Sequence, residues 1–242
     1  MLVFTNYMKY NVIHFSTIDS TNSYLKKHYD ELDDFTFVST DYQSLGRGRN
    51  DRNWIANKGE NLLFSLLIKN QDILKDGPFL SLVAAVSVCK TLEKYNLKNI
   101  EIKWPNDVYV NDYKIAGILL ESKLPNYLVI GIGLNVNQKQ FNGDYRKSPT
   151  SMFLQINKLV DINELKKELF QTLFNILNKY DKKDLLSYYE KHDYLLNKEV
   201  KYTMNNKILS GTVKGIDDSF NIVISSDENK HHISSGEIEL LK

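Results

Sequence analysis

The chain has 242 residues, of which 42% are hydrophobic and 25% are charged, and its formal net charge is +1. This length allows one large domain and one small domain, and the composition is that of a folded globular protein. A chain so close to neutral has no overall field that favours nucleic acid. A phosphate-binding site must therefore depend on a local cluster of cations.

The first ten residues lack a basic segment followed by a long apolar run, so no signal peptide is predicted. No apolar stretch approaches the length of a membrane span. The single cysteine, Cys89, lies in an apolar helical pattern and cannot form an intrachain disulfide. We therefore expect a cytoplasmic protein with no membrane partner, in which Cys89 fills the core.

Strand and helix patterns follow one another irregularly before residue 194. The polar run from Asp19 to Asn22 precedes helical spacing and predicts a helix N-terminus. Strands are predicted at 12–15, 35–40, 62–69, 100–104, 108–110, 114–121 and 127–137. Three further helices are predicted at 79–95, 162–177 and 183–193. Because the strands form hairpins and the helices come in blocks, the pattern favours an α+β fold with a mixed β-sheet.

The pattern changes near residue 195. Short β segments follow at 199–203, 208–216, 220–224, 230–233 and 237–241, separated by polar turns. This spacing predicts a small β-barrel of about fifty residues. We therefore expect two domains, 1–194 and 195–242.

A loop rich in glycine and arginine runs from Gly46 to Trp54 and reads Gly-Arg-Gly-Arg-Asn-Asp-Arg-Asn-Trp. The glycines let backbone amides approach a ligand, and the arginines suit carboxylate or phosphate oxygens. Trp54 offers a ring face to a base. The alternatives are a flexible surface loop with solvated arginines and an RNA-binding segment, although the neutral overall charge argues against RNA.

A second motif, Lys-Trp-Pro-Asn-Asp at 103–107, precedes a strand that is apolar except for Lys114. A half-buried ammonium group is costly unless an anion approaches it, so we expect a carboxylate or phosphate ligand there. The turn that Asn111 and Asp112 predict can bring Lys114 close to Asp107. In the alternative, Lys114 extends to water and Asp107 only forms a turn.

Strand periodicity predicts which side chains share a face. It places Lys114 with Ala116 and Ile118, and Gly117 on the opposite face. In the later strand it places on one face Gly131, Gly133, Asn135 and Asn137. Glycines there leave space, and the amides can bind what enters it. A close contact between strand and helix would also explain the glycines.

The polar run at the first predicted helix is the fourth candidate. Ser20 and Thr21 supply hydroxyl groups at a helix start, where backbone amides favour an anion or a polar ring. Simple capping of the helix is the alternative.

Together and in this order, the four segments resemble the biotin protein ligase family over nearly the whole chain. The Lys-Trp-Pro-Asn-Asp hairpin and the Gly-Arg-Gly-Arg loop are its most specific motifs. The resemblance implies a class II synthetase-like catalytic domain and a C-terminal SH3-like β-barrel. It also implies a two-step reaction, in which the biotin carboxylate attacks the α-phosphate of ATP to give biotinyl-5′-AMP and pyrophosphate. A lysine of a biotin carboxyl carrier domain then takes the biotinyl group and releases AMP.

The resemblance also implies the roles of individual residues. It assigns catalytic roles to Arg49, Asp107 and Lys114, and it places Asp107 where the nucleotide and its Mg²⁺ ion bind. Biotin binding falls to Ser20, Thr21, Asn22, Gln43, Gly46, Arg47, Gly48, Arg49, Lys114 and Gly117. ATP binding falls to Arg47, Arg49, Arg52, Trp54, Asn106, Asp107, Lys114 and Asn135.

Two features depart from the family pattern. Many relatives carry glycine where this chain has Asp51, and we expect Asp51 to pair with Arg49 or Arg52 when the loop is open. Bifunctional relatives carry a winged helix-turn-helix for which no room exists before Ile13, so no DNA partner is expected. Relatives often form homodimers through sheet edges, an arrangement that also covers exposed edges. For this chain the sequence leaves both a monomer and a homodimer open.

Two other functions compete with this one. A lipoate or octanoate ligase shares the catalytic fold but carries an Arg-Arg-x-Ser-Gly-Gly-Gly type loop, which is absent here. A non-catalytic biotin sensor would keep Ser20, Thr21 and Gln43 yet could lose Arg49 or Lys114, both of which are present.

Overall fold

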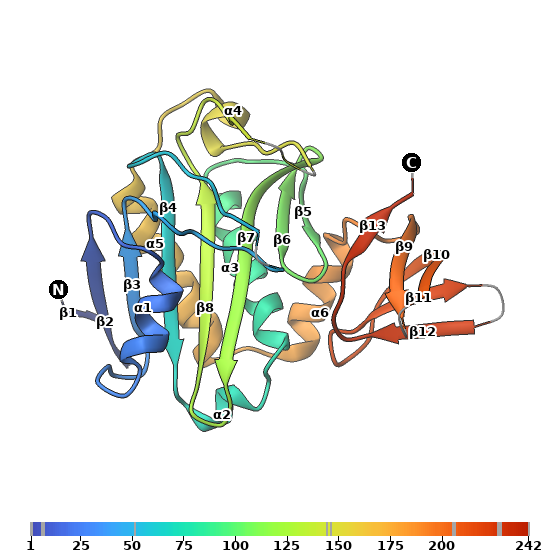
Figure 1. The fold of residues 1–242 in the computed structure, drawn as a ribbon, viewed down its shortest axis with the longest axis horizontal. Helices are drawn as coiled ribbons and strands as arrows, with labels where there is room; N and C mark the ends of the chain where they lie inside the picture. The colour runs from blue at the N-terminus through green and yellow to red at the C-terminus, as the bar shows by residue number, and fades with distance from the viewer. Residues whose placement is uncertain are drawn as a thin grey trace.

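The computed structural model describes residues 2–5, 8–50, 52–143, 145, 147–204, 207–226 and 229–241. Its larger sheet has eight strands in the order β1-β2-β3-β4-β8-β7-β6-β5 (Figure 1). These are β1 (Leu2–Thr5), β2 (Met8–Phe15), β3 (Thr36–Thr40), β4 (Asn61–Ile68), β5 (Ile100–Lys103), β6 (Asp107–Val110), β7 (Tyr113–Lys123) and β8 (Tyr127–Asn135). Only β2 and β3 pair in parallel, and the other neighbours are antiparallel. The predicted mixed sheet is therefore confirmed.

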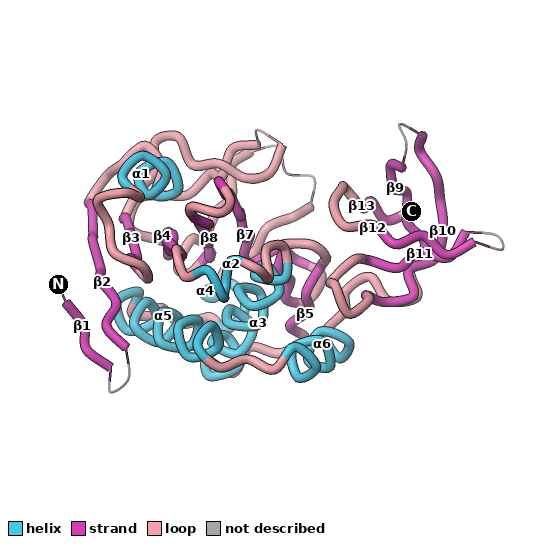
Figure 2. Tube along the Cα trace, turned by 90° about the horizontal axis from the view of Figure 1, so that it is seen from below, coloured by secondary structure: helices cyan, strands magenta, loops and turns pink. Residues whose placement is uncertain are grey.

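Six helices accompany this sheet within the described residues. They are α1 (Thr21–His28), α2 (Gln71–Leu74), α3 (Phe79–Lys94), α4 (Met152–Ile156), α5 (Ile162–Asn178) and α6 (Lys182–Lys191). Figure 2 shows α3, α5 and α6 on one side of the sheet and α1 on the other. Ser20, in the polar run that predicted a helix N-terminus, caps α1 through its side chain, and Asp161 caps α5 in the same way.

Helix α1 covers only part of its face of the sheet. The segment that follows β3 crosses the remainder of this face in front of β8 and β7 (Figure 1). On the opposite face α3 is almost entirely buried, and its Cys89 is fully enclosed, as predicted. One face of the sheet is therefore core and the other stays partly open for a site.

The C-terminal strands form a second sheet. Its order is β12-β11-β10-β9-β13, and every neighbouring pair is antiparallel. The strands are β9 (Glu199–Met204), β10 (Lys207–Ile216), β11 (Ile222–Ser226), β12 (Asn229–Ile233) and β13 (Ile238–Leu240). The predicted series of short strands is confirmed as a five-stranded antiparallel sheet.

The two sheets share a buried contact. Trp104 follows β5, is 2% exposed, and donates from Nε1 to the carbonyl of Phe220 at 2.8 Å. The Phe220 ring in turn contacts Phe79 and Tyr189. A buried, satisfied hydrogen bond inside an aromatic cluster fixes the second sheet against the first.

The short elements β1, α2 and α4 were not predicted. Helices α2 and α4 have four and five residues, too few to show a helical period. Within the described residues, no helix has both the length and the apolar character needed to cross a membrane.

Trp104→Phe should lower the free energy of unfolding by about 1–3 kcal/mol, because it leaves the Phe220 carbonyl buried without its donor. Urea unfolding measures this change. Tyr202→Phe is the matched control, since the buried Tyr202 hydroxyl has no hydrogen-bond partner in the described part of the chain. Equal losses in the two variants would contradict the role given to the Trp104 hydrogen bond.

Candidate active site

A cavity of about 900 Å³ opens on the face of the large sheet that α1 leaves uncovered. Its walls come from the start of α1, the segment 43–55, the β6–β7 hairpin, β8 and the turn before β13. Of the predicted site residues, the cavity is lined by Ser20, Thr21, Asn22, Gln43, Arg47, Gly48, Arg49, Arg52, Trp54, Asn106, Asp107, Lys114, Gly117 and Asn135. Gly46 does not line it but has a backbone role, since a Cβ there would lie 2.7 Å from the Trp54 carbonyl.

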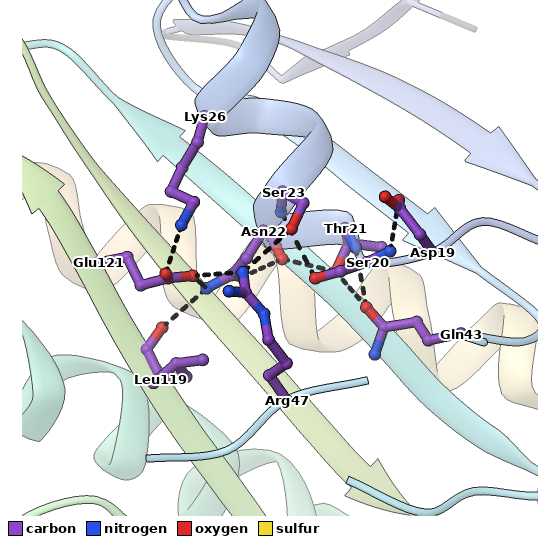
Figure 3. Close-up of polar contacts among 11 residues, drawn as sticks. Asp19, Ser20, Thr21, Asn22, Ser23, Lys26, Gln43, Arg47, Leu119 and Glu121 are labelled. Carbon is purple, nitrogen blue, oxygen red and sulfur yellow. Dashed lines mark hydrogen bonds and ion pairs between the residues drawn. The ribbon is translucent and has the colours of Figure 1, made fainter. Parts of the chain in front are cut away.

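A chain of hydrogen bonds forms the polar end of the cavity at α1 (Figure 3). Gln43 Oε1 accepts from the Thr21 backbone N–H at 2.8 Å. Thr21 Oγ1 lies 2.6 Å from Ser65 Oγ, which donates to Asn22 Oδ1 at 2.5 Å. Ser65 was not predicted, although it is the only hydroxyl residue in the apolar strand β4. That isolated polar residue is the signal that could have revealed it.

Glycines clear the floor of the cavity. A Cβ on Gly131 would lie 2.3 Å from Asn22 Oδ1, and one on Gly133 would lie 2.4 Å from the Trp54 ring. A Cβ on Gly117 would also meet Trp54, at 2.8 Å. The predicted open face of β8 is thus confirmed, and Trp54 lies across it.

The predicted face of Lys114 is wrong. A β-bulge between Val108 and Tyr109 shifts the pairing, so that Val108 pairs with Ala116 but Tyr109 pairs with Lys114. The extra residue, Ile115, breaks the period of two. Lys114 therefore lies on the same face as Gly117, where an added Cβ would be 3.4 Å from Lys114 Nζ.

The hairpin brings opposite charges together, as predicted. Lys114 Nζ lies 2.7 Å from Asp107 Oδ1, and both side chains are largely buried. The turn that aligns them contains Asn111 and Asp112 at φ 50° and 67°, the left-handed values that a two-residue hairpin turn requires.

Positive charge predominates in the cavity. Its lining includes six cationic side chains and three carboxylates among the described residues. Burial lowers the pKa of Arg49, whereas the charge of Asp107 acts in the opposite direction. Burial likewise lowers the pKa of Lys103, and Asp107 again opposes the shift. Such a site favours an anion, because an anion would stabilise the charged forms of these groups.

The arginines of the loop bind different parts of the protein. Arg49 donates to Asn106 Oδ1 and to the Gly236 carbonyl, each at 3.2 Å. Arg52 forms an ion pair with Glu237, and Arg47 pairs with Glu121 at 3.3 Å. The loop is thus attached to both sheets.

The prediction for Asp51 concerns a residue outside the described part of the chain. The contacts of the loop with Gly236 and Glu237 were not predicted, since these residues lie far from the loop in sequence. No local pattern marks them as its partners.

Three polar atoms in the cavity lining are buried and have neither a hydrogen-bond partner nor an ion-pair partner among the described residues. They are Trp54 Nε1, a donor, Asn135 Oδ1, an acceptor, and the Tyr145 hydroxyl, which can do both. Each such atom costs about 1–3 kcal/mol if it stays unsatisfied. A ligand with both donors and acceptors would offset that cost.

The protein offers no complete metal site in its described part, where no three His, Cys, Asp or Glu side chains cluster around a common point. Magnesium usually takes only one or two protein carboxylates together with substrate phosphates. Asp107 fits that pattern, because it lies in the cavity beside the cations that favour phosphate.

Comparisons with known proteins define the class of this site. Residues 14–137 match the Biotin/lipoate A/B protein ligase family, and residues 195–241 match the Biotin protein ligase C terminal domain. The bifunctional ligase/repressor BirA of Escherichia coli is 32% identical over 92% of this chain and 72% of its own length. The biotin protein ligase of Aquifex aeolicus, solved with biotin and ATP, has a TM-score of 0.85 and 28% identity over 96% of this chain and 99% of that one.

The fold and site are therefore those of a ligase that joins biotin or lipoate to protein. The match of the C-terminal domain and the E. coli relative both indicate biotin and not lipoate. The chain therefore belongs to the biotin protein ligase family. Its reaction is the transfer of biotin, through biotinyl-AMP, to a lysine of a carrier protein.

Gly133→Ala should expel the Trp54 indole from the floor of the cavity, because the new methyl group would overlap the ring. Trp104 stays buried, so the fluorescence emission should shift to longer wavelength and acrylamide quenching should rise. Leu134→Val, on the opposite face of β8, is the control and should leave the emission unchanged. An unchanged spectrum for Gly133→Ala would contradict the position given to Trp54.

Proposed function

We propose that Lys114 and Arg49 hold the carboxylate of biotin against the α-phosphate of ATP. The observation that carries this proposal is the largely buried Lys114 at the cavity floor, held by Asp107 at 2.7 Å and adjacent to Gly117. Two anions repel each other in water, and fixed cations in a partly enclosed cavity offset that repulsion.

In the first step a carboxylate oxygen of biotin bonds to the α-phosphorus of ATP. The bond from that phosphorus to the bridging oxygen breaks, and pyrophosphate leaves with the electron pair. Negative charge is spread over the phosphoryl oxygens in the transition state, where Arg49 and Lys114 stabilise it. No proton transfer is required in this step.

In the second step the amine of the carrier lysine attacks the carbonyl carbon of the mixed anhydride. The new C–N bond replaces the bond from that carbon to the phosphate oxygen of AMP. AMP leaves with the electron pair, and the amine releases its proton to water. Asp107 lies beside Lys114 and would orient the incoming amine. A loop attached on both sides of the cavity, as at Arg47 and Arg52, would limit the access of water to the anhydride.

The remaining roles follow from the position of each group. The hydroxyls and amides at α1, with Gln43, would bind the polar ring system of biotin. The unpartnered Asn135 Oδ1 would accept from the amino group of adenine, and Trp54 would pack near that base. Asp107 would hold Mg²⁺ together with triphosphate oxygens, and the ion would reduce the charge of the leaving pyrophosphate.

The partner we propose is the biotin carboxyl carrier domain of a carboxylase.

We also propose that the chain divides into two domains near residue 195 and that it forms a homodimer. The outer edge of β5 is occupied by residues 192–194, because Ile102 N–H donates to the His192 carbonyl at 2.7 Å. Pairing of two large sheets would therefore use the β1 end.

Biotin-dependent exchange of labelled pyrophosphate into ATP tests adenylate formation. Lys114→Ala should lower the exchange rate by about 100-fold or more, because it removes a cation that stabilises the transition state. Lys123→Ala is the matched control, since Lys123 is an exposed lysine at the far end of the same strand. Lipoate and octanoate serve as parallel substrates.

Exchange that occurs with lipoate instead of biotin would contradict the substrate assignment. Biotin binding without exchange in the unaltered protein would indicate a sensor. Full activity of Lys114→Ala would overturn the role given to that lysine.

A further inference from the structure

Glu121 lies on β7, outside the lining of the main cavity, yet it contacts two parts of the site (Figure 3). Its Oε2 accepts from Asn22 Nδ2 at 2.8 Å and from Arg47 Nη2 at 3.3 Å. Its Oε1 accepts from Lys26 Nζ at 2.5 Å. One largely buried carboxylate thus receives three donors from α1 and the loop.

Glu121 fixes the orientation of the Asn22 amide, with a longer contact from Asn22 Nδ2 to the Leu119 carbonyl at 3.4 Å in support. An ionised carboxylate only accepts hydrogen bonds, so the Nδ2 group of Asn22 must face it. The opposite orientation would place Asn22 Oδ1 against Glu121 Oε2 at 2.8 Å, which is repulsive. Asn22 Oδ1 is therefore directed toward Ser65.

The orientation of Asn22 determines the hydrogens further along the chain. Ser65 donates its only hydroxyl hydrogen to Asn22 Oδ1. Thr21 Oγ1 lies 2.6 Å from Ser65 Oγ and 3.0 Å from Gln43 Oε1, and its single hydrogen can serve only one of them. Because Ser65 has no hydrogen left for the shorter contact, the Thr21 hydrogen goes to Ser65, and Gln43 Oε1 keeps the Thr21 backbone N–H. The charge of Glu121 thereby sets which atoms of Thr21 and Gln43 can still donate or accept.

Glu121 keeps its charge over the working range of pH. Burial acts to raise its pKa, but hydrogen bonds from Lys26 and Asn22 and the charge of Arg47 prevail and hold the pKa below its ordinary value. The carboxylate is therefore a permanent acceptor at neutral pH.

We propose that Glu121 is a positioning residue for biotin, which sets the direction of the hydrogen-bond chain Asn22–Ser65–Thr21–Gln43 without touching the ligand. This inference rests on the proposed function, because it assumes that the polar end of the cavity binds the biotin ring. It extends the site to a carboxylate outside the main cavity.

Glu121→Gln tests the inference. The amide has nearly the same size but only one acceptor oxygen for three donors. The dissociation constant for biotin, measured by calorimetry without ATP, should rise about tenfold or more, as expected for a lost hydrogen bond to a charged group. In steady-state assays the KM for biotin should rise, whereas the KM for ATP should change by less than about twofold.

A double-mutant cycle separates positioning from general damage. In the Asn22→Ala background the hydrogen-bond chain is already cut, so adding Glu121→Gln should change the biotin affinity by less than about twofold. Glu121→Asp keeps the charge but moves the carboxylate away from Asn22 by the length of one methylene group. If Glu121→Gln folds poorly, the same cycle with Glu121→Asp tests the inference, and its effect on biotin affinity should likewise disappear in the Asn22→Ala background.

Lys26→Met is the matched control. It removes a cation from the same carboxylate, keeps the hydrocarbon stem and leaves the Asn22 contact in place. Its biotin affinity should change by less than about twofold. A loss equal to that of Glu121→Gln would show that only local charge matters and would overturn the inference.

The outcomes distinguish the inference from the function on which it rests. If the unaltered protein does not bind biotin, the proposed function fails and the inference fails with it. If it binds biotin and Glu121→Gln binds equally well, only the inference is overturned. Additive losses in the cycle with Asn22→Ala would also overturn it.

Discussion

The ion pair between Lys114 and Asp107 is the interaction on which the site depends. It forms because a bulge in the β6–β7 hairpin moves Lys114 from the core face to the cavity face. One carboxylate only partly offsets the surrounding cations, since burial lowers the pKa of both Arg49 and Lys103. The protein thus keeps a local excess of positive charge in a chain that is almost neutral overall, and a ligand anion offsets its cost.

Space is the second constraint, and glycine supplies it. Three glycines on β7 and β8 leave no side chain between the sheet and the groups above it. At Gly133 and Gly117 the Trp54 ring uses this space, and at Gly131 the Asn22 amide does so. The charged centre and the polar end therefore lie on one continuous floor, as a reaction between a bound acid and a nucleotide requires.

Much of the fold and the site could be predicted from local pattern. The glycine face of β8, the cap of α1 and the hairpin turn at Asn111 each depend on residues close in sequence, and the structure contains all three. The face of Lys114 could not be predicted, because a bulge depends on pairing between two strands.

Contacts between distant segments were also beyond the sequence. Glu237, near the C-terminus, forms an ion pair with Arg52. Glu121 accepts a hydrogen bond from Asn22, which lies 99 positions away in the sequence. An acidic residue on a strand reads as an ordinary exposed charge until the fold brings its partner close. The roles of Arg49 and Asp107 came from family resemblance, and local chemistry alone left them open.

Transfer of biotin to a carrier lysine is the activity that the fold and the cavity support together. Intact-mass analysis of a biotin carboxyl carrier domain, incubated with the protein, ATP, Mg²⁺ and an equal mixture of biotin and lipoate, tests it most directly. We expect one biotinyl group on one lysine of the carrier and release of AMP. An unmodified carrier, or one that carries lipoate, would contradict it.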